Sequence, residues 1–493
     1  MEIKEIAKLC VAAFGGEPKH IERLAGAGSS RRYYRVTSGW GAEGPATCIA
    51  TYGDDVAENR RFCTLARAFE RRMEDCGDGV CRMPHIYGES ADGHCYLQTD
   101  FGDTQLLDLI QDGRNADGYS TLDDALMHRV WKGLLILQTT AMARSEGSRP
   151  EAAFDRRRVM WDLNYFKYDF LKVCGVTFDE AALEEDFNRL ADDIGAYPAA
   201  ACGFMYRDFQ SRNLMCIDSR PGDVPAWGFI DFQGGMRGPA LYDAVSFLWQ
   251  AKAAFEPRWR QRMLEAYIER LAMLTGCRED ELRRAAPRFV TLRTLQVLGA
   301  YGFRGLIEHK AHFVESIPHA LQNLRQLIEE GALDDYPELK RLSSEVCALK
   351  IFTPDEHPTL RVEVLSFSYK KGYPVNFTGN GGGFVFDCRG MHNPGRYAEY
   401  RPLTGYDAPV KRFLEEQGEV QKFVANAAGM VDPCVATYLR RGFRNLQVAF
   451  GCTGGRHRSV YCANAMAAHI KELYPAAEVR LIHREQGIDT MLD

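Results

Sequence analysis

The hydrophobic pattern along the first 345 residues falls into two parts. Residues 20–105 carry short apolar runs typical of strands around one helical stretch, Asp54 to Met73. Residues 120–330 are mainly helical in pattern. This change predicts a strand-rich lobe at residues 1–104 and a helical lobe at residues 105–345.

The pattern changes again after a turn-rich stretch that contains Pro354 and Pro358. Beyond it, short β-rich runs alternate with helical stretches, an order typical of an α/β layer. We therefore predict a linker at residues 346–358 and a smaller α/β domain at residues 359–493. Its expected strands are 360–367, 384–388, 446–450 and 478–482, and its expected helices are 409–427 and 460–473.

Composition and charge agree with a folded protein of several domains. The chain has 493 residues, of which 46% are hydrophobic and 26% charged, both near the globular average. At about 150 residues per domain, this length predicts two to four domains. Residues 350–493 hold 18 Lys+Arg and 15 Asp+Glu, whereas residues 1–349 hold 43 and 52. The two parts therefore differ in electrostatic character.

No stretch of the sequence predicts a membrane span. The longest apolar stretch, around Trp131 to Ala143, falls short of the roughly 20 residues that cross a bilayer and contains Lys132. Glu2 and Glu5 stand where a signal peptide would be basic. The fifteen cysteines are scattered without a CxxC pair, which is typical of free thiols in a reducing compartment. These features predict a cytoplasmic protein without membrane contact.

Two acidic motifs stand at a spacing that suits phosphoryl transfer. The first is Tyr206 to Met215 (YRDFQSRNLM), and the second is Gly228 to Gln233 (GFIDFQ). Phosphoryl transfer from ATP needs a carboxylate that orients the attacking hydroxyl, and oxygen ligands for magnesium. Either aspartate alone would be typical of a capped turn after a strand. The two motifs together favour a kinase site.

This pattern resembles the catalytic and metal-binding loops of protein-kinase-like phosphotransferases, in particular the aminoglycoside phosphotransferase group. The resemblance implies an α+β, two-lobed, protein-kinase-like fold that uses ATP and Mg²⁺. It makes Asp208 the catalytic base, and Asn213 and Asp231 the magnesium ligands. Asp243, in the later segment GPALYDAVS, is expected to anchor the catalytic loop rather than to take part in the chemistry.

A loop of small residues near the start of the chain, LAGAGSSRRYYRV, is expected to cover the phosphates of the nucleotide. Glycines and serines let backbone amides approach phosphate oxygens. The expected ATP contacts are Gly26, Gly28, Ser29 and Ser30 of this loop, and Asp100 in the hinge segment LQTDFG.

The lysine that kinases place on the third strand is missing. No lysine stands between Lys19 and Lys132. An arginine can grip phosphate oxygens with two nitrogens and so can replace a lysine. Arg31, Arg32 and Arg35 are the nearest candidates; we choose Arg32 for ATP binding and expect Glu58 of the following helix to pair with it.

The cluster SSRRYYRV also resembles the N-acetylmuramate and N-acetylglucosamine anomeric kinases, and this likeness covers most of the first 330 residues. It implies a small amino-sugar substrate and a role in cell-wall recycling. Trp161, Tyr165 and Tyr168 share one face of a predicted helix, a pattern typical of core packing but also of a sugar-stacking surface. Asp162 and Lys167 are candidates for binding sugar hydroxyls or a carboxylate.

A second glycine-rich turn, GCTGGRHRSV, follows a predicted strand and precedes a helix. Such a turn offers backbone amides at a helix N-terminus, which bind anions. With the segments LSFSYKKG, FDCR, HNP and RPLTG, it resembles the C-terminal domain of RapZ, an RNase adapter family that senses glucosamine 6-phosphate and binds regulatory RNA. The resemblance implies an amino-sugar-phosphate site at Asp387, His392, Thr453, Gly454 and Arg458.

Two other activities have sequence features in this second part. RNA binding has little support, because the ATP-binding half of RapZ with its GxxxxGK[ST] loop is absent and the net charge of the part is only modestly positive. Cys452 and Arg458 stand in the Cys-x5-Arg-Ser spacing of cysteine phosphatases, in which a thiolate is the nucleophile. Phosphate binding without catalysis is the favoured interpretation.

The sequence thus predicts an ATP-dependent kinase for an amino sugar, joined to a domain that recognises an amino-sugar phosphate. Two alternatives stay open. One is a pseudokinase scaffold, suggested by the missing lysine. The other is an RNA-binding adapter that uses Lys370, Lys371, Arg456, His457 and Arg458.

Overall fold

The computed structural model describes residues 2–24, 31–41, 44–76, 81–115, 118–142, 153–217, 226–349, 352, 359–374, 383–416 and 418–492. The chain forms two compact units. The first comprises Met1–Lys167, Thr177–Leu298 and His319–Cys347, and the second comprises Tyr168–Val176, Gly299–Pro318 and Ala348–Asp493. Two short segments of the predicted helical lobe therefore group with the second unit. Most of the predicted linker at 346–358 lies outside the described residues.

The first unit begins with an antiparallel sheet in the strand order β1-β2-β3-β6-β5. Helix α1 (Glu2–Phe14) packs on β5 and β6, and its Ile6 and Cys10 share one core with Val36 and Leu97. Helix α2 (Val56–Cys76) follows β3 and also contacts β5 and β6. The strands are β1 (His20–Arg23), β2 (Arg32–Thr37), β3 (Thr47–Tyr52), β5 (Ile86–Glu89) and β6 (Cys95–Thr99).

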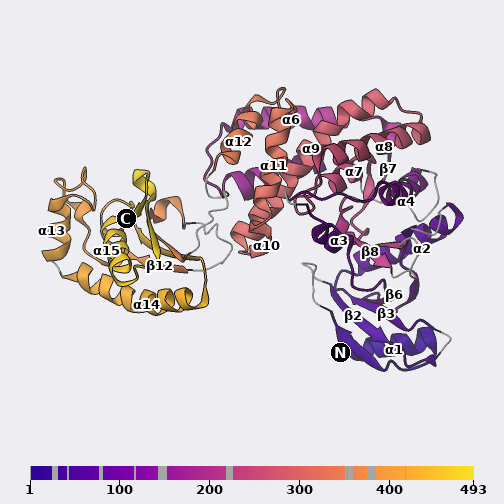
Figure 1. The fold of residues 1–493 in the computed structure, drawn as a ribbon, viewed down its shortest axis with the longest axis horizontal. Helices are drawn as coiled ribbons and strands as arrows, with labels where there is room; N and C mark the ends of the chain where they lie inside the picture. Colours follow the sequence, from indigo (N-terminus) through magenta and orange to yellow (C-terminus); the bar gives the residue numbers. More distant parts are fainter. Residues whose placement is uncertain are drawn as a thin grey trace. The chain divides into compact units, whose positions relative to one another are not determined.

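The remainder of the first unit is mainly helical, as the sequence predicts (Figure 1). Its core is rich in aromatic side chains: Trp131 packs edge-on against Phe247 and Tyr267, and all three are buried. None of the helices among the described residues combines the length and the apolar composition needed to cross a membrane. The helices are α3 (Leu106–Asp112), α4 (Asp124–Met142), α5 (Arg156–Phe166), α6 (Glu180–Gly195), α7 (Leu241–Leu248), α8 (Pro257–Thr275), α9 (Glu279–Tyr301), α11 (Ile317–Glu329) and α12 (Pro337–Cys347).

Two small sheets interrupt these helices and carry the acidic motifs. Strand β7 (Cys202–Met205) pairs with β10 (Met236–Pro239). Strand β8 (Leu214–Ile217) forms an antiparallel pair with β9 (Ala226–Phe229), which also pairs with β4 (Cys81–Arg82). The register sets Leu214 opposite Phe229, so the residue before β8 and the residues after β9 meet at the same end of the pair.

The second unit contains a mixed sheet in the order β12-β13-β11-β14-β15. Its first four strands run parallel, and β15 runs antiparallel to β14. The four predicted strands are confirmed, and β15 is an element that the sequence analysis missed. The strands are β11 (Arg361–Ser368), β12 (Gly383–Asp387), β13 (Asn445–Cys452), β14 (Glu478–His483) and β15 (Ile488–Leu492).

Alternation along these strands separates the two faces of the sheet. Val364, Val448 and Leu481 belong to the main core together with buried residues of α13 (Ala408–Glu416), α14 (Glu419–Arg441) and α15 (Arg458–Leu473). Leu365, Phe367 and Ala449 form a separate small cluster, because neighbouring side chains on a strand point to opposite faces. The single helix predicted at 409–427 is in fact two helices, α13 and α14, which are separated at Gly418.

Candidate functional site

The two acidic motifs both contain a residue with a left-handed backbone. Arg207 has a φ of 72° and Asp231 a φ of 66°. Residues other than glycine rarely adopt this conformation, since their Cβ atom crowds the backbone. Such strain persists only where the surrounding structure holds it, and it gathers at functional sites.

Asp243 of α7 holds the first of these loops. Its carboxylate accepts hydrogen bonds from the backbone N–H groups of Tyr206 (2.7 Å) and Arg207 (2.8 Å) and from Nε2 of Gln138 (2.8 Å). The side chain is completely buried, and burial raises its pKa to about 7 against the lowering effect of these three donors. The expected structural role of Asp243 is confirmed.

Asn213 and Asp231 lie next to each other because of the β8–β9 pair. Asn213 precedes β8, and its carbonyl accepts from the Ile230 N–H at 3.0 Å. Its amide nitrogen donates to the backbone carbonyl of Asp208 (2.8 Å) and to Oδ2 of Asp231 (3.3 Å). Nε2 of Gln233 donates to Oδ1 of Asp231 at 2.8 Å. One asparagine thus ties the predicted base loop to the predicted metal-binding loop.

The donor set of these two residues fits magnesium. An amide oxygen and a carboxylate are the hard oxygen ligands that Mg²⁺ takes beside phosphate oxygens. Burial raises the pKa of Asp231, and the nearby Asp208 carboxylate raises it further. A bound divalent cation would counter both effects, because it favours the ionised carboxylate.

A cavity of about 430 Å³ lies beside this pair. Its size is within the range of small-molecule sites. It is lined by the hinge residues Gln98 to Asp103, by Arg31 and Tyr96 of the strand-rich lobe, and by Asn213, Ile230 and Asp231. Asp100 faces this cavity at its hinge, where it accepts hydrogen bonds from Arg35 (2.7 Å) and the Gly102 N–H (3.0 Å). Burial opposes ionisation of Asp100, but these donors outweigh it and lower its pKa.

Of the candidate arginines for ATP binding, Arg31 rather than Arg32 lies at the cavity. Arg31 lines the cavity, is 5% exposed, and contacts Oε1 of Glu58 on α2 at 2.9 Å. Arg32 instead pairs with Glu2 (3.1 Å) and Asp54 (3.3 Å). The geometry therefore favours Arg31 over the chosen Arg32 as the arginine beside the cavity, and Glu58 pairs with Arg31 instead of with Arg32 as expected. The physical reason is that successive residues of an extended chain point in opposite directions.

We expect Arg31→Met to lower kcat/KM for ATP by about 10- to 100-fold, the effect of losing a hydrogen bond to a charged group. Arg32→Met is the matched control and should change kcat/KM for ATP less than about twofold, because its side chain pairs at the surface. Steady-state kinetics with varied ATP measure both. Equal losses in the two variants would contradict this assignment of Arg31.

Asp208 has a buried neighbour that sequence reasoning missed. Its carboxylate is 46% exposed, and Nη2 of Arg293 on α9 lies 3.6 Å from its Oδ1. Arg293 is held by Gln296 (2.9 Å) and by the hydroxyl of Tyr242 (3.4 Å). No motif signals Arg293, because it comes from a helix that begins far along the chain from Asp208.

The predicted aromatic stripe runs from α5 into the π-helical segment Lys167–Leu171 and lies partly at the surface. Trp161 is 61% exposed and Tyr168 is 50% exposed, so these two rings are not core residues. Asp162 is buried and accepts from Nη2 of Arg207 at 3.2 Å. Lys167 is also buried, and its ammonium pairs with Glu180 at 2.5 Å. The expected phosphate contacts Gly26, Gly28, Ser29 and Ser30 lie outside the described residues.

The second candidate site lies at the carboxyl ends of the parallel strands in the second unit, the usual binding edge of such sheets. The register pairs Asp387 at the end of β12 with Gly451 near the end of β13. Thr453 and Gly454 follow β13 and are exposed. His392 lies on the segment after β12, where its Nε2 is 3.1 Å from the Tyr397 hydroxyl. Asp387 and the Thr453–Gly454 turn therefore come together at one edge.

The packing of this turn requires a glycine at position 455. Its φ is 64°, and an added Cβ would lie 2.4 Å from Cγ of Glu485 and 2.9 Å from the Ser368 nitrogen. Glu485 in turn pairs with Lys371 at 2.7 Å and with Arg484 at 3.0 Å. The turn is thus clamped against the ends of β11 and β14, which keeps its exposed amides in place.

Arg458, expected as a phosphate ligand, is a buried side chain. It is 3% exposed, and its Nη1 donates to the carbonyls of Arg389 (2.9 Å) and Met391 (2.7 Å). The guanidinium therefore holds the segment after β12 in place. Cys452 is also buried, with its Sγ 3.1 Å from Oγ of Ser459.

A buried histidine in β14 makes the stability of this sheet depend on pH. His483 is fully buried, its Nδ1 lies 2.7 Å from Oγ of Ser366, and burial lowers its pKa to about 4. Its pKa in the unfolded chain is about 6.5, so the unfolded state binds more protons between these values. We expect the free energy of unfolding to fall by about 3 kcal/mol as the pH drops from about 6.5 to about 4.

Hydrogen exchange of the β14 amides in the full chain, corrected for intrinsic rates, measures this change. His483→Gln should remove most of the pH dependence in this window. His469→Gln, at a partly exposed histidine of α15 that pairs with Asp432, should retain it. An unchanged pH dependence in His483→Gln would show that another group is responsible.

Comparison with known proteins finds two families, one for the first part of the chain and one for the last part. Residues 20–279 match the phosphotransferase enzyme family, and residues 360–487 match the RapZ C-terminal domain. A nucleotide-binding protein of Xanthomonas axonopodis pv. citri is 37% identical over 293 residues, which is 57% of this chain and 94% of that protein. A nucleotide-binding protein of Acidothermus cellulolyticus is 39% identical over 139 residues, 28% of this chain and 43% of that protein.

Two solved structures are also similar. The microcompartment-associated aminopropanol kinase is 17% identical with a TM-score of 0.45, over 68% of this chain and 98% of that one. The GDP complex of an aminoglycoside 2'-phosphotransferase is 14% identical with a TM-score of 0.41, over 68% of this chain and all of that one (100%). On the family matches, the chain belongs to the phosphotransferase enzyme family and carries a RapZ C-terminal domain.

Proposed function

We propose that this phosphotransferase transfers the γ-phosphoryl group of ATP to a hydroxyl of a small amino sugar. The observation that carries the proposal is the group of Asp208, Asn213 and Asp231, which hydrogen bonds join beside the cavity that Arg31 and the hinge also line. These are the parts that phosphoryl transfer needs: a base, oxygen ligands and a cation near the phosphates.

Each residue has a distinct part in the proposed reaction. Arg31, oriented by Glu58, binds phosphate oxygens in the cavity. Asn213 and Asp231 hold Mg²⁺, which neutralises charge on the phosphates when bound. Asp208 orients the acceptor hydroxyl for in-line attack and takes its proton. Arg293, whose Nη2 lies 3.6 Å from Oδ1 of Asp208, helps to hold that carboxylate in position.

The Arg31–Glu58 pair also argues against a pseudokinase scaffold. The missing lysine is the feature that suggests a pseudokinase. In kinases this lysine forms an ion pair with a glutamate of the adjacent helix. Here an arginine forms the same kind of pair with Glu58 of α2 at 2.9 Å. We therefore favour an active enzyme.

N-acetylmuramate and N-acetylglucosamine are the proposed acceptors. The support is the resemblance of the first part to the anomeric amino-sugar kinases, together with the exposed ring of Trp161, a surface that can stack on a sugar. We further propose that the RapZ C-terminal domain binds an amino-sugar phosphate at Asp387 and the exposed Thr453–Gly454 turn, with His392 nearby. The chain would then bind in one domain the class of compound that the other makes.

Phosphorus NMR of the purified protein with magnesium-ATP tests the kinase. The panel of acceptors is N-acetylmuramate, N-acetylglucosamine, glucosamine and an aminoglycoside. A new sugar-phosphate resonance supports the proposal, and its coupling shows which hydroxyl was attacked. An unchanged ATP spectrum with every acceptor would contradict it. Calorimetry with glucosamine 6-phosphate tests the second domain separately, with Thr453→Ala as the variant expected to weaken binding.

A further inference from the structure

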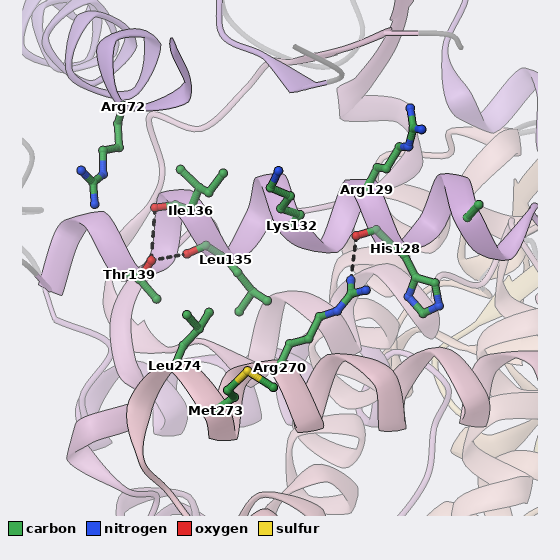
Figure 2. Close-up of a pocket in the computed structure, with 11 residues that line it drawn as sticks. Arg72, His128, Arg129, Lys132, Leu135, Ile136, Thr139, Arg270, Met273 and Leu274 are labelled. Carbon is green, nitrogen blue, oxygen red and sulfur yellow. Dashed lines mark hydrogen bonds between the residues drawn. The ribbon is translucent and has the colours of Figure 1, made fainter. Parts of the chain in front are cut away.

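A second cavity of the first unit is unrelated to the phosphotransfer site. It measures about 740 Å³ and lies between α4 and α8, next to the end of α2 (Figure 2). It shares no lining residue with the cavity beside Asp231. The proposed function therefore leaves this groove without a role.

The floor and one edge of the groove are apolar. Leu135 of α4 and Leu274 of α8 point into the space between the two helices, and Ile136 lies one residue further along α4 (Figure 2). Met273 is 83% exposed and Leu274 is 57% exposed. The Thr139 hydroxyl donates to the carbonyls of Leu135 (2.6 Å) and Ile136 (3.5 Å), so it is satisfied within its own helix. Two adjacent, strongly exposed apolar side chains beside a groove are typical of a contact surface.

The charged side chains that line this groove are basic. Arg129 and Lys132 of α4, Arg270 of α8 and Arg72 of α2 line the groove, and no carboxylate is among its described lining residues. Residues 1–349 carry an excess of acidic side chains, with 52 Asp+Glu against 43 Lys+Arg. A basic groove on an acidic part of the chain favours an acidic partner.

The spacing along α4 indicates the shape of that partner. Its lining residues run from Ala125 through His128, Lys132 and Ile136 to Thr139, at intervals of three or four residues. At about 1.5 Å per residue this face is about 21 Å long, which is four turns of a helix. A groove of this length between two helices accommodates a third helix, whose apolar stripe would cover the floor.

We propose that this groove binds an acidic amphipathic helix of a partner protein. The apolar stripe of the partner lies over Leu135, Met273 and Leu274, and its carboxylates face Arg129, Lys132 and Arg270. Such binding would bring a second protein to the helical part of the first unit without contact with the residues proposed for phosphoryl transfer.

The test uses the full chain and a labelled 18-residue helical peptide with leucines every three or four residues and glutamates on both flanks. Fluorescence anisotropy measures its binding. We expect the peptide to bind more tightly than a scrambled peptide of the same composition, and to weaken as salt rises. A double variant, Met273→Glu with Leu274→Glu, and Lys132→Glu should each weaken binding at least about tenfold.

Met430→Glu is the matched control, because Met430 is 55% exposed on α14 of the second unit. It should bind the peptide like the wild-type protein, and all variants should keep wild-type phosphotransfer activity, which reports on folding of the lobe. Equal binding of helical and scrambled peptides, or unaltered binding in the groove variants, would overturn the proposal. Two further outcomes would also overturn the proposal. If the protein forms a dimer in sedimentation that Met273→Glu with Leu274→Glu abolishes, the occupant is a second copy. If it binds phosphatidylglycerol vesicles and the same changes abolish that binding, the occupant is a lipid surface.

Discussion

Asp208→Asn is expected to slow phosphoryl transfer by about 10²- to 10⁴-fold, the usual contribution of a general base. The amide keeps the size of the side chain, but it cannot accept the proton of the attacking hydroxyl. Asn213 bonds to the backbone carbonyl of residue 208 rather than to its side chain, so the adjacent metal-binding loop should stay in place. ATP affinity should therefore change little. Single-turnover kinetics and equilibrium binding of a fluorescent ATP analogue measure the two quantities separately.

The control for this variant is Asp192→Asn, an exposed aspartate on α6 that pairs with Arg156 at 2.9 Å. It should turn over like the wild-type protein. Wild-type turnover in Asp208→Asn would refute the assignment of the base. A loss of ATP binding together with turnover would show instead that the substitution disrupts the loop.

Asp243→Ala is expected to lower the free energy of unfolding of the first unit by about 3–5 kcal/mol. The substitution leaves the N–H groups of Tyr206 and Arg207 and the amide of Gln138 without their common acceptor in a fully buried position. Because Arg207 has a left-handed backbone, the loop should also relax and Asp208 should lose its position. Urea unfolding followed by tryptophan fluorescence reports on this unit, since the six tryptophans all precede residue 260.

Asp186→Ala is the matched control for Asp243→Ala. Asp186 is also buried, but its carboxylate accepts from the Leu339 N–H at 2.9 Å, a single backbone donor against the three groups that Asp243 holds. Its loss should cost about 1–3 kcal/mol. Equal destabilisation by the two variants would mean that burial alone, and not the clamp on the catalytic loop, sets the effect. Phosphotransfer by the folded fraction of Asp243→Ala should fall, whereas Asp186→Ala should keep it.

Much of the fold was predictable because local patterns decide it. The helix expected at residues 54–73 is α2 (Val56–Cys76), and the strand expected at 446–450 is the centre of β13 (Asn445–Cys452). The helix expected at 409–427 was wrong in extent. Gly418 has a φ of 67° and ends the continuity between α13 and α14, while α14 continues through Pro433 because Val431 and Val435 are buried in the core.

The sequence by itself determined the chemistry of the phosphotransfer site. Asp208, Asn213 and Asp231 are separated only by one short turn and one pair of antiparallel strands, so their proximity follows from local pairing. The glycine-rich turn at Gly451 to Gly455 was predictable for the same reason, because a strand and a helix flank it directly.

Only the tertiary structure decided which side chains support these sites. Arg31 and Arg32 are adjacent residues of the same type, so the sequence does not distinguish them. In the extended chain at the start of β2 their side chains point in opposite directions: Arg31 contacts Glu58 beside the cavity, and Arg32 contacts Glu2 and Asp54. Arg293 reaches Asp208 from α9, and Arg458 donates to carbonyls of the segment after β12. These roles depend on contacts between residues far apart in the chain, which side-chain packing sets and local spacing does not encode.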